Sequence, residues 1–75
     1  MNQLEIAELT KAHWRQYHPA SYQELKANGT LDKEAIACAK LTQLEMDALK
    51  LIGMSPQEAW TESRNLFCLK DPLKQ

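Results

Sequence analysis

The sequence predicts an all-α domain, a compact bundle of three to four helices around a central helix at about residues 31–52. The chain has 75 residues, and its eleven leucines and nine alanines favour helices. It contains no valine, and three isoleucines and four threonines are too few β-branched residues to populate a sheet. Apolar residues also recur at helical spacing between breaks rich in proline and glycine. The length predicts a single helical domain over 1–75, without a linker.

The first two predicted helices cover residues 3–17 and 20–28 and are separated by Pro19. A proline inside one long helix would remove the amide bond to the carbonyl of Arg15, so we predict two helices with a bend. Gly29 is suited to the left-handed conformation that commonly ends a helix. The first helix has a wide apolar face that we expect to be buried. This face comprises Leu4, Ile6, Ala7, Leu9, His13, Trp14 and Tyr17.

The predicted helix over 31–52 has two apolar faces and only a narrow polar stripe. One face carries Leu31, Ala35, Cys38, Ala39, Thr42, Met46 and Leu49. The other carries Ala37, Leu41, Leu44, Ala48, Leu51 and Ile52. A helix that is apolar almost all round is normally buried on both sides. Three short neighbouring helices have little surface with which to cover both faces of a helix about 30 Å long. Two interpretations stay open, because the leucine-rich face is either core or a contact surface for another chain.

The fourth predicted helix covers 56–69 and starts at the clearest local signal in the chain. Gly53 can end the preceding helix, Ser55 can cap the next one, and Glu58 completes a capping box around the proline at position 56. An Asp-Pro pair ends this helix. Its apolar face comprises Ala59, Trp60, Ser63, Leu66 and Phe67.

Residues capable of catalysis or metal binding are present but are not grouped. His13, His18, Cys38 and Cys68 are of the types that bind zinc. Two histidines five positions apart point about 140° away from each other on a helix, which is a poor arrangement for one metal ion. The two glycines form no phosphate-binding loop. We therefore expect no enzyme, with no catalytic, cofactor-binding or metal-binding residue and no small-molecule substrate.

Charge and cysteine usage suggest a cytoplasmic protein. The formal net charge of −1 argues against both a basic nucleic-acid clamp and an acidic DNA mimic. No run of 18 apolar residues predicts a membrane span, and the first residues lack the basic and apolar regions of a secretory signal. Two cysteines without a C-x-x-C motif favour a reducing compartment.

The leading functional hypothesis is a small interaction module that binds a protein partner or a second copy of itself. The leucine-rich face of the helix at 31–52 is the expected contact surface, with a glutamate supplying polar specificity at its rim. The expected partner-binding residues are Leu41, Leu44, Glu45, Ala48 and Leu51.

Two alternatives remain. The chain could be a helix-turn-helix-like DNA-binding regulator, whose recognition helix at 56–69 would contact nucleic acid through Gln57, Thr61, Arg64 and Asn65. The same helix carries Glu58 and Glu62, and their negative charges disfavour DNA binding because that binding depends on neutralising phosphates. The second alternative is a structural or assembly accessory protein of a phage, which requires ordered oligomers.

The sequence over 13–67 resembles small helical accessory proteins of bacteriophages and transposons. The resemblance is carried by the pairs His13-Trp14, Glu45-Met46 and Ala59-Trp60, by Tyr17, by the spacing of Tyr22 and Leu25, and by Gly29-Thr30-Leu31. It implies an origin in a phage or other mobile element and a non-enzymatic role. It also implies that the partner is a host protein, and an inhibitor of a host defence system such as CRISPR would be one such case.

Overall fold

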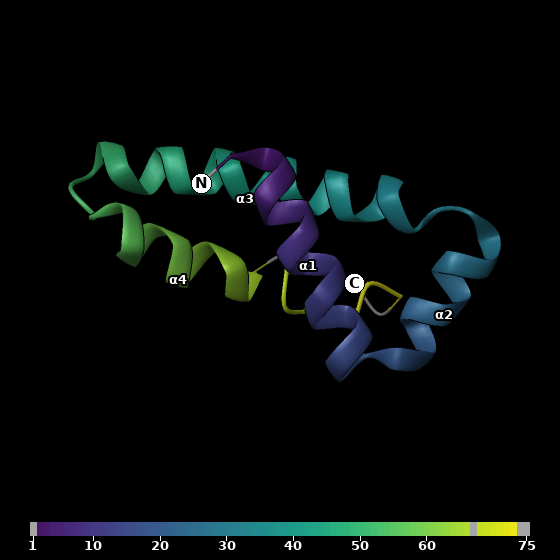
Figure 1. The fold of residues 1–75 in the computed structure, drawn as a ribbon. Coiled ribbons are helices and arrows are strands. Elements are labelled where there is room, and N and C mark those ends of the chain that lie inside the picture. The colour runs from purple at the N-terminus through teal and green to yellow at the C-terminus, as the bar shows by residue number, and fades with distance from the viewer. Residues whose placement is uncertain (1, 67, 74–75) are drawn as a thin grey trace.

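A computed structural model describes residues 2–66 and 68–73 and confirms the all-α fold. Its elements are α1 (Gln3–Tyr17), α2 (Pro19–Asn28), α3 (Leu31–Leu51) and α4 (Pro56–Leu66), and the described ranges contain no strand. The long helix α3 runs alongside α4, α1 crosses α3 steeply, and α2 leads back to the start of α3 (Figure 1). The central helix is therefore α3, as the sequence predicts.

The bend between the first two helices lies at His18, whose backbone (φ −134°, ψ 58°) is not helical. The His18 amide still donates to the Trp14 carbonyl at 2.8 Å, and the His18 carbonyl accepts from Tyr22 at 2.9 Å. The prediction of two separate helices is confirmed. Helix α2 begins at Pro19, one residue earlier than predicted, because the first helical position needs no amide donor and suits the fixed φ of proline.

Glycines follow the ends of α2 and α3, as predicted, although α3 ends at Leu51, one residue earlier than predicted. Gly29 is left-handed (φ 73°), which allows the following amide, that of Thr30, to reach the Leu25 carbonyl at 3.0 Å. Gly53 also has a positive φ of 105° and leads the chain towards α4. Side chains with a Cβ rarely adopt such conformations, so the two loops depend on glycine at these positions.

The capping box at the start of α4 is confirmed. The Glu58 amide donates to Ser55 Oγ at 3.2 Å, and the Ser55 amide donates to Glu58 Oε1 at 3.4 Å. The predicted end at residue 69 is wrong, because α4 ends at Leu66. The chain turns there and places Cys68 in the core with 1% of its surface exposed. Phe67, predicted to lie on the apolar face of this helix, falls outside the described residues.

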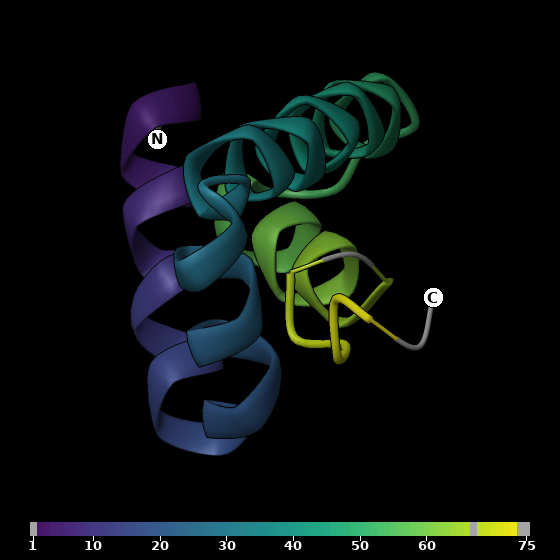
Figure 2. The same ribbon diagram turned by 90° about the vertical axis from the view of Figure 1, so that its right-hand side faces the viewer.

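The core lies where α1 and α4 both pack on one side of α3 (Figure 2). The inner face of α3 is rich in small side chains, which allows its neighbours to approach closely. Its buried members are Ala35, Cys38, Ala39, Thr42 and Met46, and they pack with Ile6, Ala7, Thr10 and Trp14 of α1 and with Ala59 and Ser63 of α4.

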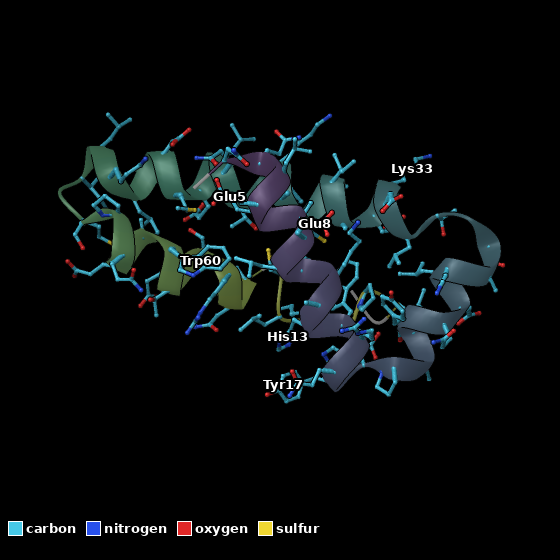
Figure 3. The ribbon with its side chains drawn as sticks, viewed as in Figure 1. Glu5, Glu8, His13, Tyr17, Lys33 and Trp60 are labelled. Atoms are coloured by element: carbon cyan, nitrogen blue, oxygen red, sulfur yellow. The ribbon has the colours of Figure 1, made fainter. Side chains whose placement is uncertain are left out.

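The burial predicted for two of the apolar faces is too wide. In α1, Leu4 is 70% exposed, Leu9 47% and Tyr17 61%, so the buried strip is narrower than predicted. Leu4 and Leu9 lie to either side of the buried strip around the helix axis, and Tyr17 lies at the end of α1 that is far from α3 (Figure 3). Leu66, in the last turn of α4, is also 48% exposed.

Residues 68–73, here called the C-terminal strap, return to the junction between α1 and α2. The indole Nε1 of Trp14 donates to the Lys70 carbonyl at 3.0 Å, and Ser21 Oγ donates to Asp71 Oδ1 at 2.6 Å. His18 Nε2 lies 3.2 Å from the Leu69 carbonyl oxygen. These contacts join segments about fifty residues apart and close the fold around Trp14, which is fully buried.

Candidate protein-interaction site

The side of α3 that faces away from the other helices carries a continuous row of apolar side chains. We call this row the outer leucine face, and it consists of Ala37, Leu41, Leu44, Ala48 and Leu51. The exposed fractions are 49% for Leu41, 68% for Leu44 and 88% for Leu51. Ile52, directly after the helix, adds another apolar side chain that is 76% exposed.

The outer leucine face is uncovered because of how the helix distributes its side chains. Thr42 and Met46 point into the core. Leu44 is two residues from each of them and therefore lies about 160° away from both around the helix axis. Both α1 and α4 lie on the inner side of α3 (Figure 2). Within residues 2–66 and 68–73, a single molecule therefore has no element that covers the outer side.

Charged and polar residues border the outer leucine face. Lys40 and Asp47 are exposed along one edge, and Glu45 is half-buried along the other. Asp47 Oδ1 lies 3.4 Å from Lys50 Nζ and accepts a hydrogen bond from Gln43 Nε2 at 3.2 Å. An apolar centre with a polar rim is the usual composition of a protein interface.

The structure brings the expected contact residues of α3 onto one surface. Leu41, Leu44, Ala48 and Leu51 are exposed on the outer leucine face, and Glu45 is half-buried at its edge. The residues of the DNA-binding alternative are less uniform in orientation. Gln57 and Asn65 are exposed, the Thr61 hydroxyl donates to the Gln57 carbonyl at 3.0 Å, and Arg64 is half-buried.

Arg64 lines a pocket of about 220 Å³ between α1, α4 and the C-terminal strap, which sequence reasoning missed. The pocket also contacts His13 and Trp60, whose side chains are labelled in Figure 3. The Arg64 Nε atom is buried and has no hydrogen-bond partner within the described part of the chain. The residues that line the pocket come from three segments far apart in the sequence, so no local spacing indicates the pocket.

The ionisable side chains near this pocket influence one another. Burial lowers the pKa of His13 below its ordinary value of 6.5, the Leu69 backbone opposes this effect, and the nearby side chains of His18 and Arg64 act in the same direction as burial. The His13 ring also lies 4.6 Å from the Tyr17 ring, centroid to centroid. His13 is therefore a largely neutral packing residue at pH 7.

Neither the cysteines nor the histidines assemble a metal centre in the part of the chain that is described. Within these residues, no three side chains of His, Cys, Asp or Glu gather closely enough to hold an ion. Cys38 and Cys68 are buried, and Cys68 Sγ lies 3.1 Å from the Thr42 hydroxyl. The described helices include none with the length and apolarity needed to cross a membrane.

No known protein family, curated protein or solved structure matches this chain. The fold and the site define a class only, which is a small helical bundle with one uncovered apolar helix face.

Proposed function

We propose that the chain is a small non-enzymatic protein-interaction module that binds a protein through the outer leucine face. The observation that carries this proposal is the exposure of three leucines in a row on one side of an unbroken helix. A single exposed leucine is ordinary on protein surfaces, but a continuous apolar row of this length is typical of interfaces.

The energetics favour an occupied face. Burying one leucine side chain is worth about 1.5–3 kcal/mol, so the three leucines together represent a substantial driving force for association. The apolar residues of this face recur every three or four positions, which is the spacing with which a helix docks against another helix or into a groove. The charged rim would determine the orientation of the partner more than it would raise the affinity of binding.

The resemblance to phage and transposon accessory proteins supports a host protein as one partner, and a second copy of the chain also fits this face. The proposal includes a mobile-element origin and a cytoplasmic location, which the two buried cysteines favour. Inhibition of a host defence system would follow if the partner belongs to one.

A DNA-binding function has less support. The exposed side of α4 carries Glu58 and Glu62, and the half-buried Arg64 offers only part of its guanidinium to a phosphate. Counterion release by several cations supplies most of the affinity in such complexes.

The test compares Leu41→Glu with Leu66→Glu. Both leucines are about half exposed, 49% and 48%, but only Leu41 lies on the outer leucine face. The wild-type chain and both variants are immobilised and used to capture proteins from a cytoplasmic extract of the cells that express the chain. Self-association of each chain is measured separately by sedimentation. We expect Leu41→Glu to weaken association about thirtyfold, equivalent to about 2 kcal/mol, because a charge would have to be buried in the contact.

The control Leu66→Glu should retain wild-type association, and both variants should keep their helical circular dichroism. Equal loss with the two variants would contradict the proposal, since it would indicate a nonspecific effect of charge. A wild-type chain that neither captures a protein nor self-associates would contradict it as well.

A further inference from the structure

We infer that the outer leucine face binds a second copy of the same chain, with the two α3 helices antiparallel across a two-fold axis. This inference rests on the proposed function, because it names the occupant of the same face. Three independent features of α3 support it: the spacing of the apolar residues, the symmetry of their sizes, and the placement of charges around them.

The spacing of the outer leucine face is that of a helix-helix seam. Its five members follow one another at intervals of four, three, four and three residues. This is the heptad repeat that keeps an apolar seam against a partner helix over two heptads. The core-facing residues Thr42 and Met46 occupy other heptad positions, so the seam is available without rearrangement of the fold.

The sizes of four of these side chains, from Ala37 to Ala48, are symmetric about the middle of α3, and Leu51 lies beyond them, opposite Glu34 of the second copy. When Leu41 of one copy lies opposite Leu44 of the other, the two-fold axis places Leu44 opposite Leu41 in turn. The same register places Ala37 opposite Ala48 at both ends of the leucine layers. Two central leucine layers flanked by two alanine layers form a self-complementary surface, and α3 overlaps its partner over most of its length.

The charges at the edge also match in this register. Lys40 and Asp47 lie seven residues apart on the same edge of the outer leucine face, and both are exposed. Pairing Leu41 with Leu44 brings Lys40 of each copy next to Asp47 of the other, which gives two opposite-charge contacts related by symmetry. The other edge, which carries Glu45, meets no like charge, because it lies opposite the position of the uncharged Cys38 in the second copy.

The antiparallel direction is favoured over the parallel one by the ends of the helix. The first turn of α3 carries Asp32, Lys33 and Glu34 and is therefore acidic by one net charge, and the last turn carries Lys50. Antiparallel packing brings the acidic turn near the basic turn of the partner and aligns the two helix dipoles favourably. Parallel packing would place the two acidic turns side by side. Figure 3 shows Lys33 pointing away from α1, so this end of α3 is open on its outer side.

The experiment uses two charge-reversal variants, Lys40→Glu and Asp47→Lys, with dimerisation measured by sedimentation equilibrium. We expect the wild-type chain to dimerise and each variant alone to dimerise about tenfold more weakly, because two attractive contacts become repulsive. An equimolar mixture should regain wild-type affinity as a heterodimer. In that heterodimer the introduced glutamate meets the introduced lysine, and the Asp47 kept by the first variant meets the Lys40 kept by the second. Native mass spectrometry identifies the heterodimer by its mass.

Three results would overturn the inference. They are a wild-type chain that stays monomeric at millimolar concentration, a dimer that Leu44→Glu leaves intact, and a mixture that associates no more tightly than either variant alone. Rescue instead by pairing Lys40→Glu with Glu45→Lys would indicate parallel helices and would also overturn it. A monomeric chain that still loses a captured protein on Leu41→Glu would refute self-pairing while leaving the proposed function standing.

Discussion

Thr10 and Thr42 show how this small core accommodates polar side chains. Both are fully buried, and their hydroxyls donate to the carbonyls of Ile6 and Cys38, one turn earlier in their own helices, at 2.8 Å. A buried hydroxyl without a partner would cost about 1–3 kcal/mol. Because each threonine is satisfied within its own helix, neither hydroxyl needs a polar partner on the other helix where α1 and α3 pack closely.

His13 is the residue whose environment has the clearest consequence for stability. Burial lowers its pKa below 6.5 in the folded chain. A contact with the Leu69 backbone opposes this effect, and the nearby side chains of His18 and Arg64 add smaller effects in the same direction as burial. The unfolded chain therefore binds the proton at a higher pH than the folded chain does. Stability contributed by neutral His13 is present above the unfolded pKa and is lost progressively as the pH falls from there through the folded pKa.

We predict that the free energy of unfolding decreases between about pH 7.5 and about pH 5.5, and that His13→Gln makes this decrease smaller. The substitution removes the group that is protonated more readily in the unfolded state. Urea denaturation at the two pH values provides the measurement. An equally steep decrease in the variant would show that another group is responsible.

Among the helices, local signals were sufficient to predict most of the ends. The N-terminal cap of α4 and the left-handed Gly29 depend on interactions within about four residues, which the sequence displays directly. The end of α4 could not be predicted in this way. Cys68, which was predicted to lie in this helix, is instead buried after its end, in a core built from distant segments.

The capping box of α4 gives a prediction of its own. Ser55→Ala should lower the free energy of unfolding by about 1 kcal/mol, because the amide of Glu58 loses its side-chain acceptor. Thr61→Ala is the matched control, since the Thr61 hydroxyl donates only to a carbonyl within its own helix. We expect that substitution to be nearly neutral in chemical denaturation. Equal destabilisation by both would show that the cap contributes nothing specific.

The candidate site was predictable only in part. Helical periodicity identifies two apolar faces on α3 and places Leu41, Leu44 and Leu51 together on one of them. It does not decide how much of that face the rest of the chain covers. The small side chains of the other face, such as Ala35 and Ala39, allow both neighbouring helices to pack there, and the leucines are left exposed.

Across the whole molecule, the C-terminal strap joins the end of the chain to the junction of the first two helices. Asp71 Oδ1 accepts hydrogen bonds from Ser21 Oγ and from the Leu73 amide, at 2.6 and 3.0 Å. Asp71 Oδ2 also lies 3.8 Å from His18 Nδ1. The side chain of Asp71 is only 20% exposed, so these contacts are shielded from water.

We predict that Asp71→Ala lowers the free energy of unfolding by about 2 kcal/mol, because Ser21 loses a charged acceptor in a largely buried place. Asp32→Ala is the comparison. Asp32 lies 2.8 Å from Lys11 Nζ, but its side chain is 77% exposed, and we expect a loss of about 0.5 kcal/mol. Chemical denaturation of both variants tests the difference, and a larger loss for Asp32→Ala would refute the role of the strap.

The elongated shape of the molecule, 41 × 18 × 18 Å, follows from the length of α3 relative to its neighbours. Helix α3 has 21 residues, compared with 15 in α1, 10 in α2 and 11 in α4. A rounder bundle would require another helix on the outer side of α3. The exposure of the outer leucine face thus depends on the arrangement of all the helices as well as on the sequence of α3.

Sequence alone established that the chain is helical, where most helices begin and end, and that α3 is apolar on two sides. Propensity, capping and periodicity act over a few residues and can be recognised without knowledge of the fold. The packing of the helices was needed to settle that the small-residue face of α3 is covered and that the leucine face is open. It also placed His13, Trp60 and Arg64 around one pocket. These outcomes depend on the crossing of α1 over α3 and on the return of the C-terminal strap, which bring together residues far apart in the chain.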